Sequence, residues 1–140
     1  MTKIVTFGVY DYFHIGHLRL FEQCKKYGDY LIVAIQDGEY ITRFKPEAKV
    51  LYSTRERVEI IKALRVVDEV IIYNTVSVES ISQIDFDILA LGADHVGGRF
   101  DAITKWCEEN RKKVVRLKRT PGICSSEIKK SLSIERKMGE

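Results

Sequence analysis

Five short apolar runs alternate along the chain with segments of helical periodicity. The runs are rich in β-branched residues and hardly alternate between polar and apolar positions, which is typical of strands buried on both faces. They occupy residues 4–10, 30–36, 69–73, 87–91 and 114–117. We therefore predict an α/β fold: a Rossmann-like, doubly wound parallel sheet of about five strands, joined by right-handed crossovers.

The segments between these runs carry helix signals. The first repeats an apolar residue at every third position, through Ile15, Leu18, Phe21 and Cys24, and Gly28 then ends it. A second begins with Ser53 followed by Glu56, the signature of a capping box. The pattern predicts helices over 53–64, 102–113 and 125–137 and a short one over 76–84. Residues 37–52 show no clear period, so we expect a long loop with a functional role.

Composition narrows the class of protein. With 140 residues, 45% hydrophobic and 31% charged, the chain has the balance of one globular domain. We expect neither a membrane partner nor a secretory signal, because no apolar run approaches the ~20 residues that span a bilayer. Three cysteines without CxxC spacing indicate a reduced cytoplasmic protein. The net charge of +3 is too weak to indicate nucleic acid but suits a small anionic ligand.

Chemistry-bearing residues gather after the predicted strands. In an open α/β sheet, ligands bind beyond the carboxyl ends of the strands, where the strand order reverses. Three stretches fall at such ends: 8–17, 92–98 and 118–126. The sequence therefore predicts one site built from all three.

His14 and His17 are the most distinctive pair in the first stretch. They are three residues apart, so they share one face of a helix near its N-terminus, where backbone N–H groups favour an anion. Gly16 lets a ligand approach the backbone there. Three interpretations stay open from the residues alone: a phosphate site, a structural pair, or a metal site with His95 as third ligand. Neither GxxxxGK[ST] nor GxGxxG occurs, which excludes the common P-loop and dinucleotide motifs.

Several blocks of the chain resemble a known family. "HIGH" after "GVYD" is similar to the HxGH signature of the nucleotidyltransferase superfamily. The blocks "GDYLIVAI", "RVVDEVI", "LGADHVGGRFD" and "RTPGICSSEIKK" resemble, in order, those of bacterial glycerol-3-phosphate cytidylyltransferases, in the cytidylyltransferase branch. The resemblance implies a nucleotide-binding catalytic domain over 1–132 and a C-terminal tail over 133–140.

The resemblance implies a reaction and its partners. A small phosphorylated acceptor attacks the α-phosphate of CTP, which transfers CMP, releases pyrophosphate and gives a CDP-activated metabolite. It further implies Mg²⁺ as cofactor and a homodimer. Three alternatives remain: a glycerol-3-phosphate cytidylyltransferase proper, an ATP-dependent adenylyltransferase of the same superfamily, and a nucleotide-binding module without turnover.

The resemblance also implies which residues form the site. The catalytic residues would be His14, His17, Lys45 and Arg119. The nucleotide would be bound by Gly8, Val9, Tyr10, Asp11, Gly16, Lys49, Gly92, Asp94, Thr120, Gly122, Ile123, Ser125 and Ser126. The acceptor would be bound by Arg57, Arg65 and His95. No protein metal site is implied, since Mg²⁺ would be held mainly by the triphosphate, with Asp11 reaching it through water.

The chain departs from the family pattern around the fourth strand. Where glycerol-3-phosphate cytidylyltransferases typically carry Asp-Asp-Trp, this sequence has Ala93, Asp94 and His95. The usual threonine at position 9 is Val9. These changes predict an acceptor other than simple glycerol 3-phosphate, for example a carboxylate-bearing phosphate of the amino-acid or sugar-acid kind.

Overall fold

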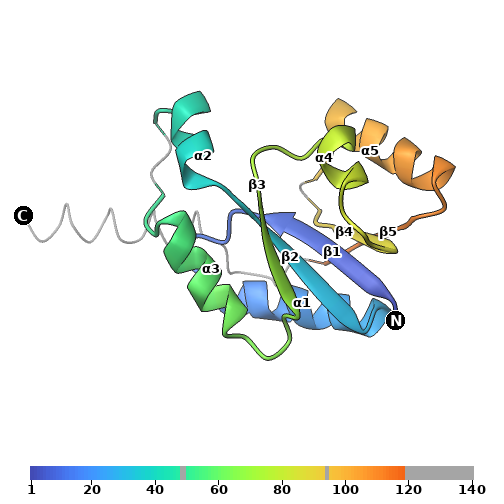
Figure 1. Ribbon diagram of the computed structural model, residues 1–140, viewed down its shortest axis with the longest axis horizontal. Coiled ribbons are helices and arrows are strands. Elements are labelled where there is room, and N and C mark those ends of the chain that lie inside the picture. The colour runs from blue at the N-terminus through green and yellow to red at the C-terminus, as the bar shows by residue number, and fades with distance from the viewer. Residues whose placement is uncertain (48–49, 94, 119–140) are drawn as a thin grey trace, which may run out of the picture.

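A parallel sheet of five strands forms the centre of the protein, in the order β3-β2-β1-β4-β5 (Figure 1). The computed structural model describes residues 1–47, 50–93 and 95–118. The strands are β1 (Lys3–Gly8), β2 (Tyr30–Gln36), β3 (Glu69–Tyr73), β4 (Ile88–Leu91) and β5 (Lys113–Arg116). All four neighbouring pairs are parallel, with Val5 of β1 opposite Ile32 of β2 and Leu89 of β4. The predicted α/β fold is confirmed.

Helices cover both faces of the sheet. They are α1 (Ile15–Tyr27), α2 (Gly38–Phe44), α3 (Thr54–Lys62), α4 (Val78–Ser82) and α5 (Gly98–Glu109). Helices α1 and α3 pack on one face and α4 and α5 on the other (Figure 1). The chain changes faces after β3, so the strand order reverses between β1 and β4. Among the described helices, none is long and apolar enough to cross a membrane.

Alternate residues of the central strands feed two apolar cores. Leu31, Val33 and Ile35 point to the core beneath α1 and α3, while Ile32 and Ala34 point to the core beneath α4 and α5. Burial of each such aliphatic side chain contributes about 1.5–3 kcal/mol, although Ala34 contributes less. Because both faces of these strands are buried, their sequences are continuously apolar, and this pattern correctly located the sheet.

Some element boundaries differ from the predictions. The segment expected to be a loop over 37–52 contains α2, whose N-cap Asp37 accepts a hydrogen bond from the backbone N–H of Tyr40 (3.3 Å). Only Ile41 of this short helix is buried, so no apolar period marks it in the sequence. Helix α5 begins at Gly98, four residues before the predicted start. The helix predicted over 125–137 and the tail over 133–140 lie outside the described residues.

Candidate functional site

The carboxyl ends of β1, β2 and β4 meet where the strand order reverses. The segment between Gly8 and α1 follows β1, Asp37 follows β2, and Gly92 follows β4. This is the edge at which open α/β sheets bind ligands. The structure therefore brings the first two predicted stretches to one edge of the sheet.

The backbone after β1 is strained. Tyr10 and Tyr12 adopt positive φ angles, 57° and 50°, on either side of Asp11. Bulky residues rarely adopt this left-handed conformation, which costs on the order of 1 kcal/mol or more and concentrates at functional sites. The turn folds the Tyr10 ring back over Gly8, where an added Cβ would lie 2.6 Å from Tyr10 Cζ. Glycine is therefore required at position 8 as long as the turn keeps this shape.

Tyr10 packs in the core against His17. Its side chain is buried, and its ring meets those of His17 and Phe21 edge-on, with centroids 5.4 and 5.2 Å apart. Burial raises the pKa of the Tyr10 hydroxyl well above its usual range. The predicted nucleotide-binding residue Tyr10 thus lies in the core, where its ring holds the imidazole of His17.

The backbone at the start of α1 orients both histidines. The N–H of Gly16 donates to His14 Nδ1 (3.0 Å), and the N–H of His14 donates to His17 Nδ1 (3.2 Å). The two rings stack with centroids 4.0 Å apart. Because each Nδ1 accepts a hydrogen bond, each neutral ring carries its proton on Nε2. Both imidazoles therefore present Nε2–H as a donor.

Burial keeps both rings neutral near pH 7. It lowers the pKa of His17 to about 4, with a smaller contribution from His14, and it also lowers the pKa of His14. His14 Nε2 is buried and has no hydrogen-bond partner among the described residues. A buried donor without a partner costs about 1–3 kcal/mol. Such a donor fits an acceptor atom from a ligand, such as a phosphate oxygen.

Asp11 and Arg57 are both buried. The Asp11 carboxylate accepts hydrogen bonds from the backbone N–H groups of Leu51 (2.6 Å) and Tyr52 (3.0 Å). The Arg57 guanidinium donates to backbone carbonyls, including that of Val9 (2.9 Å). Burial lowers the pKa of Arg57, and the nearby charge of Asp11 opposes that shift.

The stretch after β4 forms a separate group of contacts. The N–H of Gly92 donates to His95 Nδ1 (3.1 Å), and the His95 ring stacks on Phe100 with centroids 5.0 Å apart. Arg116 at the end of β5 donates to the carbonyls of Gly92 and His95. Sequence reasoning missed Arg116, although its place at the end of a strand was a usable signal.

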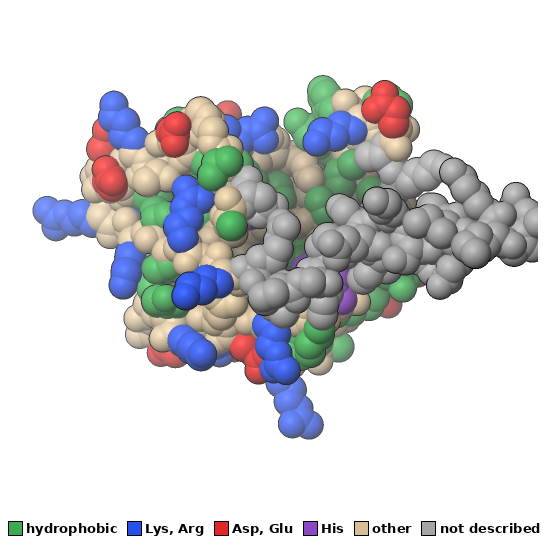
Figure 2. Space-filling model, turned by 180° about the vertical axis from the view of Figure 1, so that it is seen from behind, with side chains coloured by type: hydrophobic (Ala, Val, Ile, Leu, Met, Phe, Trp, Pro, Cys, Tyr) green, Lys and Arg blue, Asp and Glu red, His purple; other side chains and the backbone are tan. Residues whose placement is uncertain are grey.

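The remaining predicted residues are spread more widely. Lys45 is exposed at the end of α2. Figure 2 shows Lys and Arg side chains spread over one face of the molecule, on which histidine also reaches the surface. Arg65 is exposed just before β3, at the opposite, amino-terminal edge of the sheet. The predicted residues outside the described part of the chain are Lys49, Asp94, Arg119, Thr120, Gly122, Ile123, Ser125 and Ser126.

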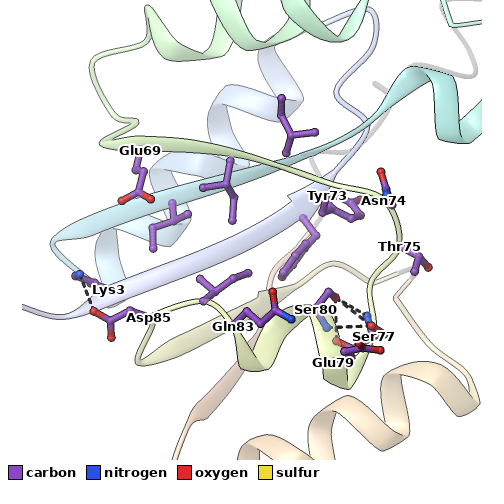
Figure 3. Close-up of a pocket in the computed structure, with 15 residues that line it drawn as sticks. Lys3, Glu69, Tyr73, Asn74, Thr75, Ser77, Glu79, Ser80, Gln83 and Asp85 are labelled. Atoms are coloured by element: carbon purple, nitrogen blue, oxygen red, sulfur yellow. Dashed lines mark hydrogen bonds and ion pairs between the residues drawn. The ribbon is translucent and has the colours of Figure 1, made fainter.

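A hollow of about 630 Å³ lies elsewhere, between β3 and α4 (Figure 3). Its apolar floor includes Phe7 and Tyr73, whose rings meet edge-on with centroids 5.1 Å apart. Ser77 and Ser80 at its rim are hydrogen-bonded to each other and form the capping box at the start of α4. Neither histidine of the site lines this hollow, so it is distinct from the site at the end of β1.

Comparison with known proteins assigns the chain to a family. Residues 5–131 match the cytidylyltransferase-like family. The chain belongs to that family. It is 36% identical to a glycerol-3-phosphate cytidylyltransferase of Bacillus subtilis over 135 residues, which cover 95% of this chain and 98% of the relative. It is 35% identical to an FAD synthase of Thermococcus sibiricus over 142 residues, which cover 99% of this chain and 93% of the relative.

A solved structure shows the same fold. The lipopolysaccharide core biosynthesis protein from Thermoplasma volcanium superposes with a TM-score of 0.72 at 24% identity, covering 86% of this chain and 98% of that one. The resemblance to cytidylyltransferases is confirmed by the family match, and the chain is an enzyme of the nucleotidyltransferase class.

Proposed function

We propose that this cytidylyltransferase-like protein transfers CMP from CTP to the phosphate of a small phosphorylated acceptor and releases pyrophosphate. The observation that carries the proposal is the pair of Nε2–H donors on His14 and His17, fixed by the backbone at the start of α1. One of them, on His14, is buried without a partner among the described residues. Two such donors suit the oxygens of a triphosphate.

The chemistry demands little from the protein beyond positioning. A phosphate nucleophile is already ionised near neutral pH, so the protein has to align it with the α-phosphate and stabilise the charge of an in-line displacement. His14 and His17 donate to phosphate oxygens as that charge accumulates. An anion beside the rings also favours their protonated forms and therefore offsets the lowering of the pKa by burial. In this proposal Lys45, Lys49 and Arg119 supply further positive charge, and Ser125 and Ser126 further donors.

In the proposal, Mg²⁺ binds together with the nucleotide and is held mainly by its phosphates. Among the described residues, no group of three or more His, Cys, Asp or Glu side chains could hold a metal ion. Mg²⁺ commonly keeps several waters and takes its other ligands from substrate phosphates. When bound, it would neutralise charge on the triphosphate. Asp11 already accepts from Leu51 and Tyr52, which favours a reach to the metal through water over direct ligation.

The acceptor-binding side of the proposal centres on His95. Its ring is fixed by Gly92 and Phe100, and Arg116 lies against the same backbone. A histidine beside an arginine suits an acceptor that carries a carboxylate in addition to its phosphate. We therefore propose such an acceptor in place of simple glycerol 3-phosphate.

The choice of nucleotide is tested by thermal stabilisation. CTP, ATP, GTP and UTP are compared, each with Mg²⁺, because a ligand at 100 times its Kd stabilises the folded state by about 2.7 kcal/mol. We expect the largest shift with CTP, and pyrophosphate release with CTP and a panel of phosphorylated acceptors. A larger shift and turnover with ATP would favour the adenylyltransferase alternative, which the similarity to an FAD synthase supports because FAD contains an adenylyl group.

We also propose a cytoplasmic homodimer. The edge strand β3 supports self-association because it exposes Ile72 (58%) beside the hollow of Figure 3. Light scattering should give twice the 16.2 kDa of one chain. A mass of one chain at micromolar concentration would contradict the dimer.

A further inference from the structure

The guanidinium of Arg57 joins three separate parts of the chain. Nη1 donates to the carbonyl of Val9 (2.9 Å), just beyond β1, and to that of Gln36 (2.8 Å), the last residue of β2. Nε donates to the carbonyl of Tyr52 (3.2 Å), and Nη2 donates to Thr54 Oγ1 (3.2 Å). Only 1% of the residue is exposed. A planar fork of five N–H donors can make this set of bonds, whereas a lysine ammonium cannot.

Asp11 binds the same short stretch of backbone as Arg57, at residues 51–52. Its carboxylate accepts the N–H groups of Leu51 and Tyr52, while Arg57 takes the carbonyl of Tyr52. The 51–52 dipeptide therefore lies between a buried anion and a buried cation. These bonds fix one end of the segment that leads from α2 to α3.

The start of α2 is fixed to the start of α3 through Asp37. Thr54 Oγ1 donates to Asp37 Oδ1 (3.1 Å) and accepts from the N–H of Gly38 (2.8 Å). A Cβ on Gly38 would lie 3.1 Å from Nη2 of Arg57, so α2 begins in close contact with the guanidinium. Lys45 lies between these two fixed points, at the end of α2.

We propose that Asp11 and Arg57 are a pair of positioning residues, which set where Lys45 at the end of α2 lies relative to His14 and His17. The inference deepens the proposed function and rests on it for its nucleotide readout. In the proposal Arg57 does not bind the acceptor phosphate, because doing so would release the partly buried carbonyls of Val9 and Gln36. Leaving these acceptors without a partner is unfavourable.

The test compares Asp11→Asn and Arg57→Lys with the control Arg55→Lys. Arg55 is on the same helix, but its side chain is 90% exposed and pairs only with Glu59 among the described contacts. Asn offers one acceptor oxygen where Asp offers two, so one of the two amide bonds is lost. The first readout is amide hydrogen exchange of the full protein without nucleotide. We expect exchange at 51 and 52 to rise ~10-fold or more in both variants, with β2 unchanged, since opening is local.

The second readout compares the affinities for CTP and CMP by calorimetry in the presence of Mg²⁺. A displaced Lys45 weakens contacts to the triphosphate more than contacts to the nucleoside monophosphate. We expect a Kd for CTP raised ~10-fold and a Kd for CMP raised less than ~2-fold, where tenfold corresponds to about 1.4 kcal/mol. The double variant should be no worse than the worse single variant, because both act on one segment.

Three results would overturn the proposal. One is unchanged exchange at 51 and 52 in both variants. Another is equal weakening of CTP and CMP, which describes a general loss of structure. The third is wild-type exchange and CTP affinity in Arg57→Lys together with lost turnover, which describes direct acceptor binding. If Arg57→Lys does not fold, Asp11→Asn decides alone. Failure of the wild-type protein to bind CTP would overturn the proposed function, while the exchange result would still decide whether the pair holds the segment.

Discussion

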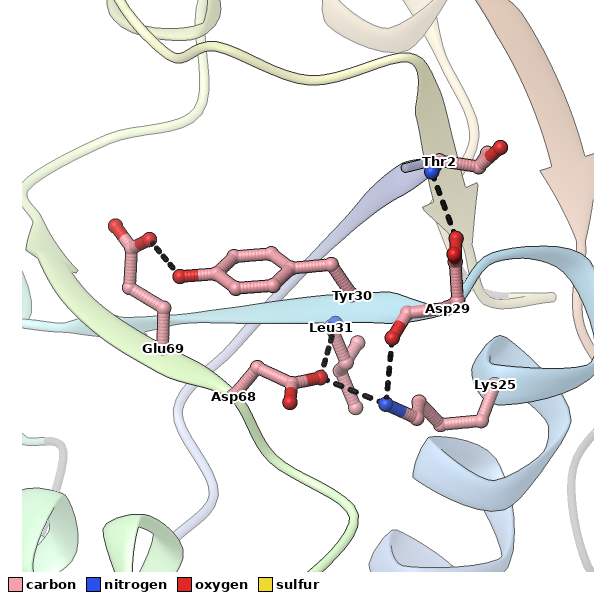
Figure 4. A network of polar contacts seen from close by, with 7 residues as sticks. All are labelled: Thr2, Lys25, Asp29, Tyr30, Leu31, Asp68 and Glu69. Atoms are coloured by element: carbon pink, nitrogen blue, oxygen red, sulfur yellow. Dashed lines mark hydrogen bonds and ion pairs between the residues drawn. The ribbon is translucent and has the colours of Figure 1, made fainter.

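The two edges of the sheet are built on different principles. At the amino-terminal edge, polar groups pair locally in partly exposed positions (Figure 4). Lys25 donates to Asp68 (2.7 Å), which also accepts the N–H of Leu31 (2.7 Å), and Asp29 accepts the N–H of Thr2 (2.7 Å). Burial works to raise the pKa of Asp68, but the bonds from Lys25 and Leu31 outweigh it and lower the pKa.

At the carboxyl-terminal edge, polar and charged groups are held in energetically unfavourable positions. Arg57 and Asp11 are charged and buried, Tyr10 and Tyr12 have positive φ angles, and His14 Nε2 has no partner among the described residues. Proteins violate local rules at functional sites and compensate elsewhere. Changes at the amino-terminal edge should therefore lower stability without weakening nucleotide binding, whereas changes at the carboxyl-terminal edge should weaken nucleotide binding.

The largest effect is expected from removing either imidazole. His14→Ala and His17→Ala should each lower kcat ~10²-fold or more, because a donor to developing charge contributes about 2.7 kcal/mol or more in comparable sites. Pyrophosphate release with CTP and a working acceptor measures this, and circular dichroism checks that the fold survives. Asparagine should rescue partially at either position, since it keeps a donor. Wild-type turnover in both alanine variants would contradict the role of the histidines.

At the amino-terminal edge, Asp68→Ala should separate stability from binding. The change leaves the N–H of the fully buried Leu31 without its acceptor and removes the partner of Lys25. We expect a loss of about 1–3 kcal/mol in the free energy of unfolding. Denaturant titration measures it, and calorimetry below the transition should show an unchanged Kd for CTP. A weakened CTP complex would mean that the two edges are not independent.

The pH dependence of stability should also distinguish the two edges, because the histidines lie at the carboxyl-terminal edge. The pKa of His17 is lowered to about 4, whereas an unfolded histidine titrates near 6.5. Between these values the unfolded state binds more protons, so stability is lost as the pH falls from about 6.5 to 4. The lowered pKa values of Asp68 and Asp29 place their losses below the ordinary range near 3.8, outside this window.

We expect the histidine loss to be about 1–2 kcal/mol after allowance for partial solvent exposure. Urea titrations at several pH values measure it, and His17→Asn, which has no titrating ring, should flatten the slope. A slope that is unchanged in His17→Asn would assign the acid sensitivity to other groups.

The sequence predicted one kind of feature well and missed another. Continuous apolar runs such as 30–36 located the strands, because burial on both faces leaves a pattern in the residues themselves. His14 and His17 do stack, but the shared helical face predicted for them was wrong. His14 is the extended N-cap of α1, and its reciprocal hydrogen bonds with the first turn bring the two rings together. The charge pattern alone favoured an exposed Arg57, since charged residues are usually exposed, whereas the side chain is buried. Its actual partners include the carbonyls of Val9 and Gln36, 48 and 21 residues away, and no side-chain pattern encodes a backbone carbonyl.

The smallest effect is expected from an exposed ion pair at the amino-terminal edge. Lys3 Nζ and Asp85 Oδ2 are 3.0 Å apart, but the Asp85 side chain is 88% exposed. Solvent screens such a pair, and ordering two mobile side chains offsets much of its attraction. Asp85→Asn should therefore leave both the Tm and the Kd for CTP close to wild type, in contrast to Asp68→Ala at the same edge. A loss in Tm as large as that of Asp68→Ala would show that stability at this edge comes from surface charge, and not from the hydrogen bond to the buried Leu31.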